Sequence, residues 1–136
     1  MWSENLAYAL IQVVHNFGAA TLVATTLFWL WPRPRPEYAR PLVGLITFAW
    51  GAQIASGALF GAASFYFYGE TPDLSVVAMI ALVIKVCSAA SGFLLGAWYV
   101  LGGRYWSNEA VKRLFRVQAA LAMLALTAAA FLRWFA

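Results

Sequence analysis

Few side chains in this chain have the chemistry of a functional site, and two that do lie inside long apolar runs. His15 is the only histidine of the 136 residues and lies within the run 6–31. Lys85 lies within another run, 73–101. An ionisable group at membrane depth costs roughly 2–3 kcal/mol or more unless it is paired or functional. We therefore treat both residues as candidate site residues.

His15 and Lys85 are predicted to lie at a similar depth. Each is roughly 14–18 Å from the outer start of its run, at about 1.5 Å per helical residue. Gln53, in the run 41–66, falls within about one helical turn of that level. Gln12 shares the helix face of His15, three residues away. Because lipid cannot satisfy polar groups, we expect these four residues to face a shared interior.

Three roles for His15 agree with this placement. As a structural residue, it would donate a hydrogen bond to a backbone carbonyl or to Gln53 and fix helix packing. As an axial ligand, its neutral imidazole would bind haem iron or another metal. The small residues 18–20 would then leave room for a flat macrocycle. As a proton carrier, it would need a polar path through the protein.

Lys85 lies too far from a helix end for its side chain to reach the interface easily. No Asp or Glu of the chain lies at membrane depth, so we expect Lys85 to have no internal partner. This absence indicates an anionic ligand group, such as a haem propionate, or an acidic residue of a neighbouring subunit. Cys87, Met79 and Met123 are soft enough to bind copper, but their spacing forms no motif and favours apolar packing.

The composition is that of a membrane protein. Hydrophobic residues make up 64% of the chain and charged residues 10%, whereas soluble domains average about a quarter charged residues. The net charge of +4 does not indicate nucleic-acid binding, because the basic residues gather in short connectors between apolar runs. The single cysteine excludes an internal disulfide and a cysteine-based metal cluster.

The apolar runs predict one transmembrane domain, residues 1–136, in an all-α fold. The four predicted spans are 6–31, 41–66, 73–101 and 108–134. Because the connectors are short, we expect an up-and-down four-helix bundle. Arg33, Arg35 and Arg40 follow the first span, and a second basic segment precedes the fourth. The positive-inside rule then places both termini outside, in an orientation typical of a bacterial inner-membrane protein.

Small residues indicate where the helices pack. Two GxxxG pairs occur in the chain, Gly57 with Gly61 and Gly92 with Gly96. This spacing lets two helix backbones approach closely in lipid. We expect both pairs to be helix-packing sites.

The ends of the spans carry interfacial and capping signals. Aromatic clusters, including the one around Trp29, are expected to form a belt at the membrane interfaces. Arg116 and Gln118, near the inner end of the fourth span, are expected at the same interface. Ser107 or Asn108 is suited to cap the fourth helix.

His15, the LFWLWPR sequence that ends its span, Lys85 and Phe115-Arg116 follow one another in an order that resembles the HemJ-type protoporphyrinogen oxidases. The chain is also similar to the wider group of CopD-like copper-resistance membrane domains. The resemblance implies haem b ligation by His15 and a role for Lys85 near a porphyrin carboxylate. It departs from the HemJ pattern at 82–84, where a Trp and a second His are replaced by Leu-Val-Ile.

The leading hypothesis is a membrane subunit of a redox or respiratory complex, in which His15 binds haem b and Gln12, Gln53 and Lys85 complete the site. The alternatives are a cofactor-free accessory subunit that stabilises a larger complex, a HemJ-like oxidase, and a CopD-like copper transporter. The expected partners are the lipid bilayer and other membrane subunits, with no nucleic acid. We expect no catalysis by the chain alone.

Overall fold

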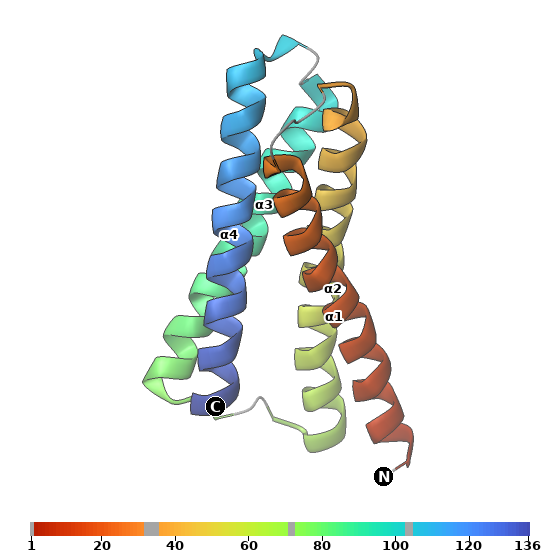
Figure 1. Cartoon of the computed structure of the whole chain (residues 1–136). Coiled ribbons are helices and arrows are strands. Elements are labelled where there is room, and N and C mark those ends of the chain that lie inside the picture. Colours follow the sequence, from red (N-terminus) through yellow and green to blue (C-terminus); the bar gives the residue numbers. More distant parts are fainter. Residues whose placement is uncertain (1, 32–35, 71–72, 103–104) are drawn as a thin grey trace.

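The computed structural model describes residues 2–31, 36–70, 73–102 and 105–136, which form four long helices (Figure 1). They are α1 (Trp2–Leu30), α2 (Ala39–Tyr68), α3 (Val76–Gly102) and α4 (Asn108–Phe135), with a short 3-10 helix, Pro36–Tyr38, before α2. The helices pack up and down, and all four are long and apolar enough to cross a membrane. The predicted all-α four-helix bundle is confirmed.

Serine side chains mark the starts of two helices. The Ser107 hydroxyl accepts a hydrogen bond from the Ala110 amide at 3.2 Å, so the predicted cap of α4 is confirmed. Helix α3 begins at Val76, later than the predicted residue 73, and the Ser75 hydroxyl accepts from the Ala78 amide at 3.2 Å. A hydroxyl at this position satisfies an amide that the first helical turn leaves free.

Both chain termini lie at the same end of the bundle (Figure 1). We call this the outer end, and the opposite end, where α2 and α4 begin, the inner end. These names follow the predicted orientation of the basic connectors. The sides of the bundle expose large apolar residues such as Phe17 (72% exposed), Phe48 (75%) and Leu94 (66%), which is the surface that a lipid bilayer covers.

The inner half of the bundle is closely packed around a buried glutamine. The Trp50 indole N–H donates to Gln118 Oε1 at 2.7 Å, and Gln118 Nε2 donates to the Gly92 carbonyl at 2.9 Å. Gln118 has no exposed surface. The expectation of an interfacial Gln118 is therefore wrong, because its amide finds both a donor and an acceptor inside the protein.

Trp29 also lies in the core and not in an interfacial belt. Its ring stacks on Phe115 of α4, with 4.4 Å between centroids and 15° between the planes. Only 4% of Trp29 is exposed. Trp29 itself therefore does not face the lipid, because its side of α1 meets α4 and an aromatic partner there, whereas its neighbours Phe28 and Trp31 are exposed.

The two glycine pairs lie in different surroundings. A Cβ at Gly92 would overlap the Trp50 indole, and one at Gly96 would overlap the Thr47 hydroxyl. Both glycines therefore let α3 approach α2. Gly57 and Gly61 are exposed, and a Cβ at either would meet no described atom within 4 Å.

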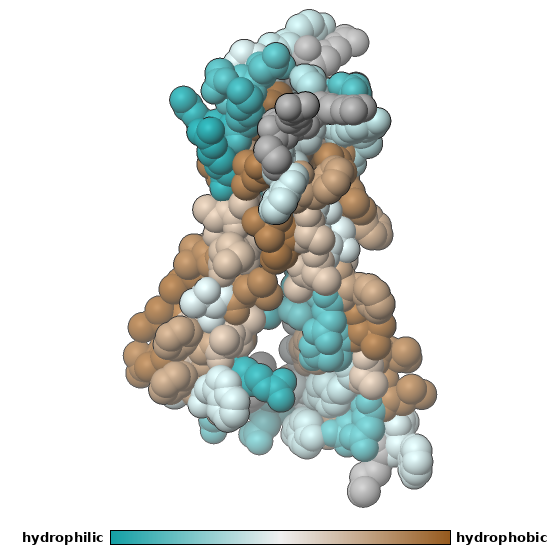
Figure 2. Space-filling view, in the orientation of Figure 1, coloured by the Kyte–Doolittle hydropathy of each residue, from teal (hydrophilic) through white to brown (hydrophobic). Residues whose placement is uncertain are grey.

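The outer half of the bundle is open. Helices α1 and α2 diverge from α3 and α4 toward the outer end (Figure 1). The space-filling view shows an opening between the two pairs, with hydrophilic residues on its walls (Figure 2). The fold thus combines a closed inner half with an outer half that holds a cavity.

Candidate functional site

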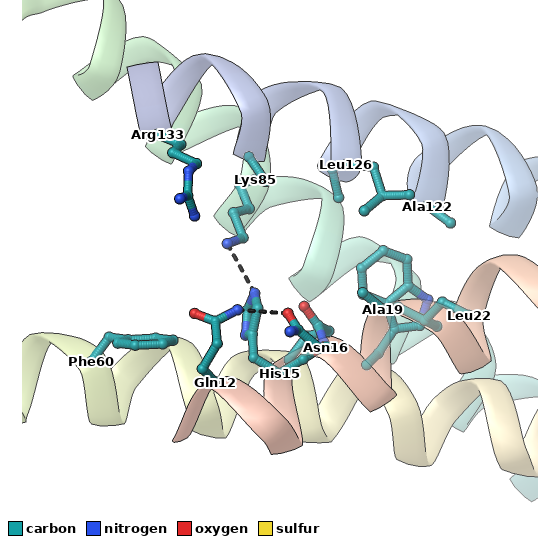
Figure 3. Close-up of a pocket in the computed structure, with 14 residues that line it drawn as sticks. Gln12, His15, Asn16, Ala19, Leu22, Phe60, Lys85, Ala122, Leu126 and Arg133 are labelled. Carbon is teal, nitrogen blue, oxygen red and sulfur yellow. Dashed lines mark hydrogen bonds between the residues drawn. The ribbon is translucent and has the colours of Figure 1, made fainter. Parts of the chain in front are cut away.

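A cavity of about 350 Å³ lies between the four helices (Figure 3). Its polar lining comes from every helix: Gln12, His15 and Asn16 of α1, Gln53 of α2, Lys85 of α3 and Arg133 of α4. Its apolar lining consists of Ala19, Leu22, Trp50, Phe60, Ala122, Ala125, Leu126 and Ala129. The cavity therefore joins the four residues that the sequence analysis selected as site residues.

The His15 ring is oriented by a serine of α2. Nδ1 lies 2.7 Å from Ser56 Oγ, and the Ser56 hydroxyl donates to the Ala52 carbonyl at 2.5 Å. Because a hydroxyl has one proton to donate, Ser56 accepts from Nδ1–H. This assigns the lone pair to Nε2. Phe60 packs against the imidazole edge to face, 5.8 Å between centroids, and restricts the ring further.

Lys85 approaches the same imidazole from α3. Its Nζ lies 3.1 Å from His15 Nε2 and donates to that nitrogen (Figure 3). The expectation that Lys85 has no internal partner is wrong. Asp and Glu are not the only possible partners of a lysine, because a neutral imidazole also accepts a hydrogen bond.

Gln53 binds the backbone of His15 and not its ring. Its Nε2 donates to the His15 carbonyl at 2.5 Å. The amide reaches this carbonyl beside Gly18, where a Cβ would lie 2.6 Å from Gln53 Nε2. Gln53 therefore fixes α1 against α2 at the level of the imidazole.

Gln12 and Asn16 form a polar pair on the α1 wall. Gln12 Nε2 donates to Asn16 Oδ1 at 2.6 Å, across one helical turn (Figure 3). Both side chains are exposed to the cavity mouth. The sequence analysis selected Gln12 alone, although a spacing of four residues also brings Asn16 to its face.

Two further polar residues of the site were not among the sequence-based candidates: Ser56, which contacts the His15 ring, and Arg133, which lines the cavity. Ser56 follows Gln53 by three residues and precedes Phe60 by four, so the helical spacing places all three on one face. Arg133 follows Ala129 by four residues in the same way. Its side chain points into the cavity (Figure 3). Helical spacing from known lining positions is the signal that would have found both.

The cavity is cationic. Lys85 and Arg133 are its charged residues, and none of the described residues that line it is acidic. A positive potential inside a cleft with apolar walls attracts anions. The arrangement therefore suits a ligand with an acidic group and an apolar body.

The soft side chains considered as copper ligands lie elsewhere. Cys87 is exposed, as are Met79 (48%) and Met123 (54%), and none of them lines the cavity. Within the described ranges, no group of three or more His, Cys, Asp or Glu residues could hold a metal ion. His15 is the candidate metal ligand that lies at the cavity.

Comparisons with known proteins found no match for this chain among family models, curated proteins or solved structures.

Proposed function

We propose that this protein is a haem b-binding membrane subunit of a redox complex, in which His15 would hold the haem iron through Nε2. The bacterial inner membrane is its proposed location. One observation carries the proposal: the sole histidine lies on a cavity among apolar helices, with its ring held by Ser56 and Nε2 directed to the cavity side. A metal-binding histidine generally donates its other ring N–H to a fixed acceptor in this manner.

The cavity walls agree with a planar ligand. Ala122, Ala125 and Ala129 of α4 give one wall short side chains, and Ala19 does the same on α1. The volume of about 350 Å³ lies at the lower end of ordinary ligand sites. The opening toward the outer end gives a larger ligand room to extend beyond this volume (Figure 2).

The polar residues of the cavity would have separate tasks. Haem supplies reversible one-electron transfer when bound. Ser56 would keep the Nδ1 proton, and Gln53 would hold the backbone of His15 in place. In this structure, Lys85 donates a hydrogen bond to His15 Nε2. Ligation of Nε2 would end this hydrogen bond and release the ammonium group for an acidic group of the ligand.

The test is a dithionite-reduced minus oxidised visible spectrum of the full chain, purified from cells supplied with haem. We expect a haem b α-band that is lost in His15→Ala and retained in Cys87→Ala. Cys87 is exposed outside the cavity and provides a matched control. A featureless spectrum of the wild-type protein would overturn the proposal. So would an α-band that persists unchanged in His15→Ala.

A cofactor-free accessory subunit is the second candidate, and two observations favour it. The hydrogen bonds from Lys85 to His15 and from His15 to Ser56 satisfy the imidazole without any ligand. In addition, the exposed Gly57 and Gly61 leave a flat helix surface on which another subunit would pack. A colourless wild-type protein whose melting temperature falls in His15→Ala would support this function.

The HemJ-like oxidase and the CopD-like copper transporter rest on the resemblance alone. The sequence has no second histidine for either one. We therefore give the haem-binding subunit priority.

A further inference from the structure

The geometry points to a carboxylate-binding subsite at the outer mouth of the cavity, in which Arg133 selects porphyrin-type ligands that carry a free acidic group. This inference rests on the proposed haem-binding function and adds the residue that recognises the ligand. It also gives the direction of the ligand, with its acidic group toward the outer end and its apolar body toward the inner half.

The first support is the position of Arg133. It lies in the last turn of α4, where a long side chain is able to extend to the membrane surface. The guanidinium group instead points into the cavity (Figure 3). Among the residues that the structure describes, it makes no hydrogen bond or ion pair. A guanidinium group presents paired N–H donors that match a carboxylate.

The second support is the distribution of charge and polarity. Lys85 lies on the same cavity, and no described lining residue carries a negative charge to neutralise the two cations. Gln12 and Asn16 line the opposite wall and bind each other through only one donor and one acceptor. Their remaining amide groups are free for a ligand. An acidic group of a ligand would therefore balance the two positive charges at the mouth of the cavity.

The third support is the closed and apolar inner end of the cavity. Leu22 and Trp50 line it there, and the Trp50 indole is held by Gln118. A cavity of about 350 Å³ does not admit a partner helix, because a helix with its side chains is about 10 Å wide. The occupant is thus a small molecule, apolar at one end and acidic at the other.

The experiment measures binding of metal-free protoporphyrin IX and of its dimethyl ester by fluorescence. The full chain is placed in nanodiscs of a zwitterionic lipid, and empty nanodiscs serve as the blank. We expect the wild-type protein to bind the diacid more tightly than the ester. Arg133→Gln should weaken diacid binding by about tenfold or more, since it removes a charge-assisted hydrogen bond. Binding of the ester should not change.

Two further variants control for charge and folding. Arg133→Lys keeps the charge and should retain part of the preference for the diacid. Arg113→Gln removes the same charge from the inner end of α4, outside the cavity, and should bind as the wild type does. Helical content by circular dichroism and a monodisperse elution profile show that each variant is folded.

Three outcomes would overturn the inference: equal binding of the diacid and the ester, unchanged diacid binding in Arg133→Gln, or loss of diacid binding in nanodiscs of phosphatidylglycerol. The last would assign the subsite to a lipid phosphate. Because the probe contains no iron, this test is separate from the test of the proposed function. Arg133-dependent binding of the diacid in a protein that shows no haem α-band would retain the subsite and reject His15 as an iron ligand.

Discussion

The two halves of the bundle treat polar residues in different ways. In the inner half, Gln118 is fully buried and both ends of its amide are bound, by Trp50 and by Gly92. In the outer half, Lys85 and Arg133 face a cavity. A polar residue with all its partners inside the protein strengthens packing, whereas polar residues that border a cavity are available to a ligand. The depth of a polar residue in the membrane therefore does not by itself show whether the residue strengthens packing or is available to a ligand.

Gly92→Leu should have the largest effect on stability. Its side chain would displace the Trp50 indole and separate it from Gln118. We expect the free energy of unfolding to fall by about 3 kcal/mol or more, because the substitution both overpacks the core and breaks a buried hydrogen bond. Thermal or denaturant unfolding in detergent measures it.

Gly57→Leu is the matched control for this substitution. A Cβ at Gly57 meets no described atom within 4 Å, so the same change should alter stability by less than about 0.5 kcal/mol. A comparable loss in both variants would contradict the contrast between the two glycine pairs.

Gln118→Ala should have the second largest effect, a loss of about 2 kcal/mol. It leaves the Trp50 indole N–H buried without an acceptor and empties the space of the amide. The same unfolding assay applies. Arg116→Ala provides the comparison, since Arg116 is exposed on the same helix and should lose little stability. Equal stability of Gln118→Ala and the wild type would show that the inner half does not depend on this amide.

Apart from the control variants, the contact between His15 and Lys85 should have the smallest effect on stability, and a double-mutant cycle measures it. Hydrogen bonds between side chains in membrane proteins average about 0.6 kcal/mol. We expect His15→Ala and Lys85→Met to be coupled by about 0.5–1 kcal/mol, since each removes the 3.1 Å contact between Nζ and Nε2. A coupling as large as the effect of Gln118→Ala would show that this pair serves stability in the same way as the inner half.

Much of the fold was predictable because the local signals were strong. The apolar runs defined four helices, and the serine before α4 defined its start. Simple depth arithmetic also placed His15, Lys85 and Gln53 at one level, and the cavity joins all three. The hydrogen-bond partners within the site were less predictable. Gln53 binds the backbone of His15 and Ser56 binds its ring, whereas the sequence alone offered Gln53 or a carbonyl as the ring's acceptor.

The sequence by itself determined the number, length and apolar character of the helices, because these are properties of each segment alone. Only the tertiary structure decided that Gln118 is buried, that Lys85 donates to His15, and that Arg133 points into the cavity. The physical reason is that each of these contacts depends on the rotation of a helix about its axis and on its angle to its neighbours. Packing between helices sets both quantities, and no single apolar run encodes them.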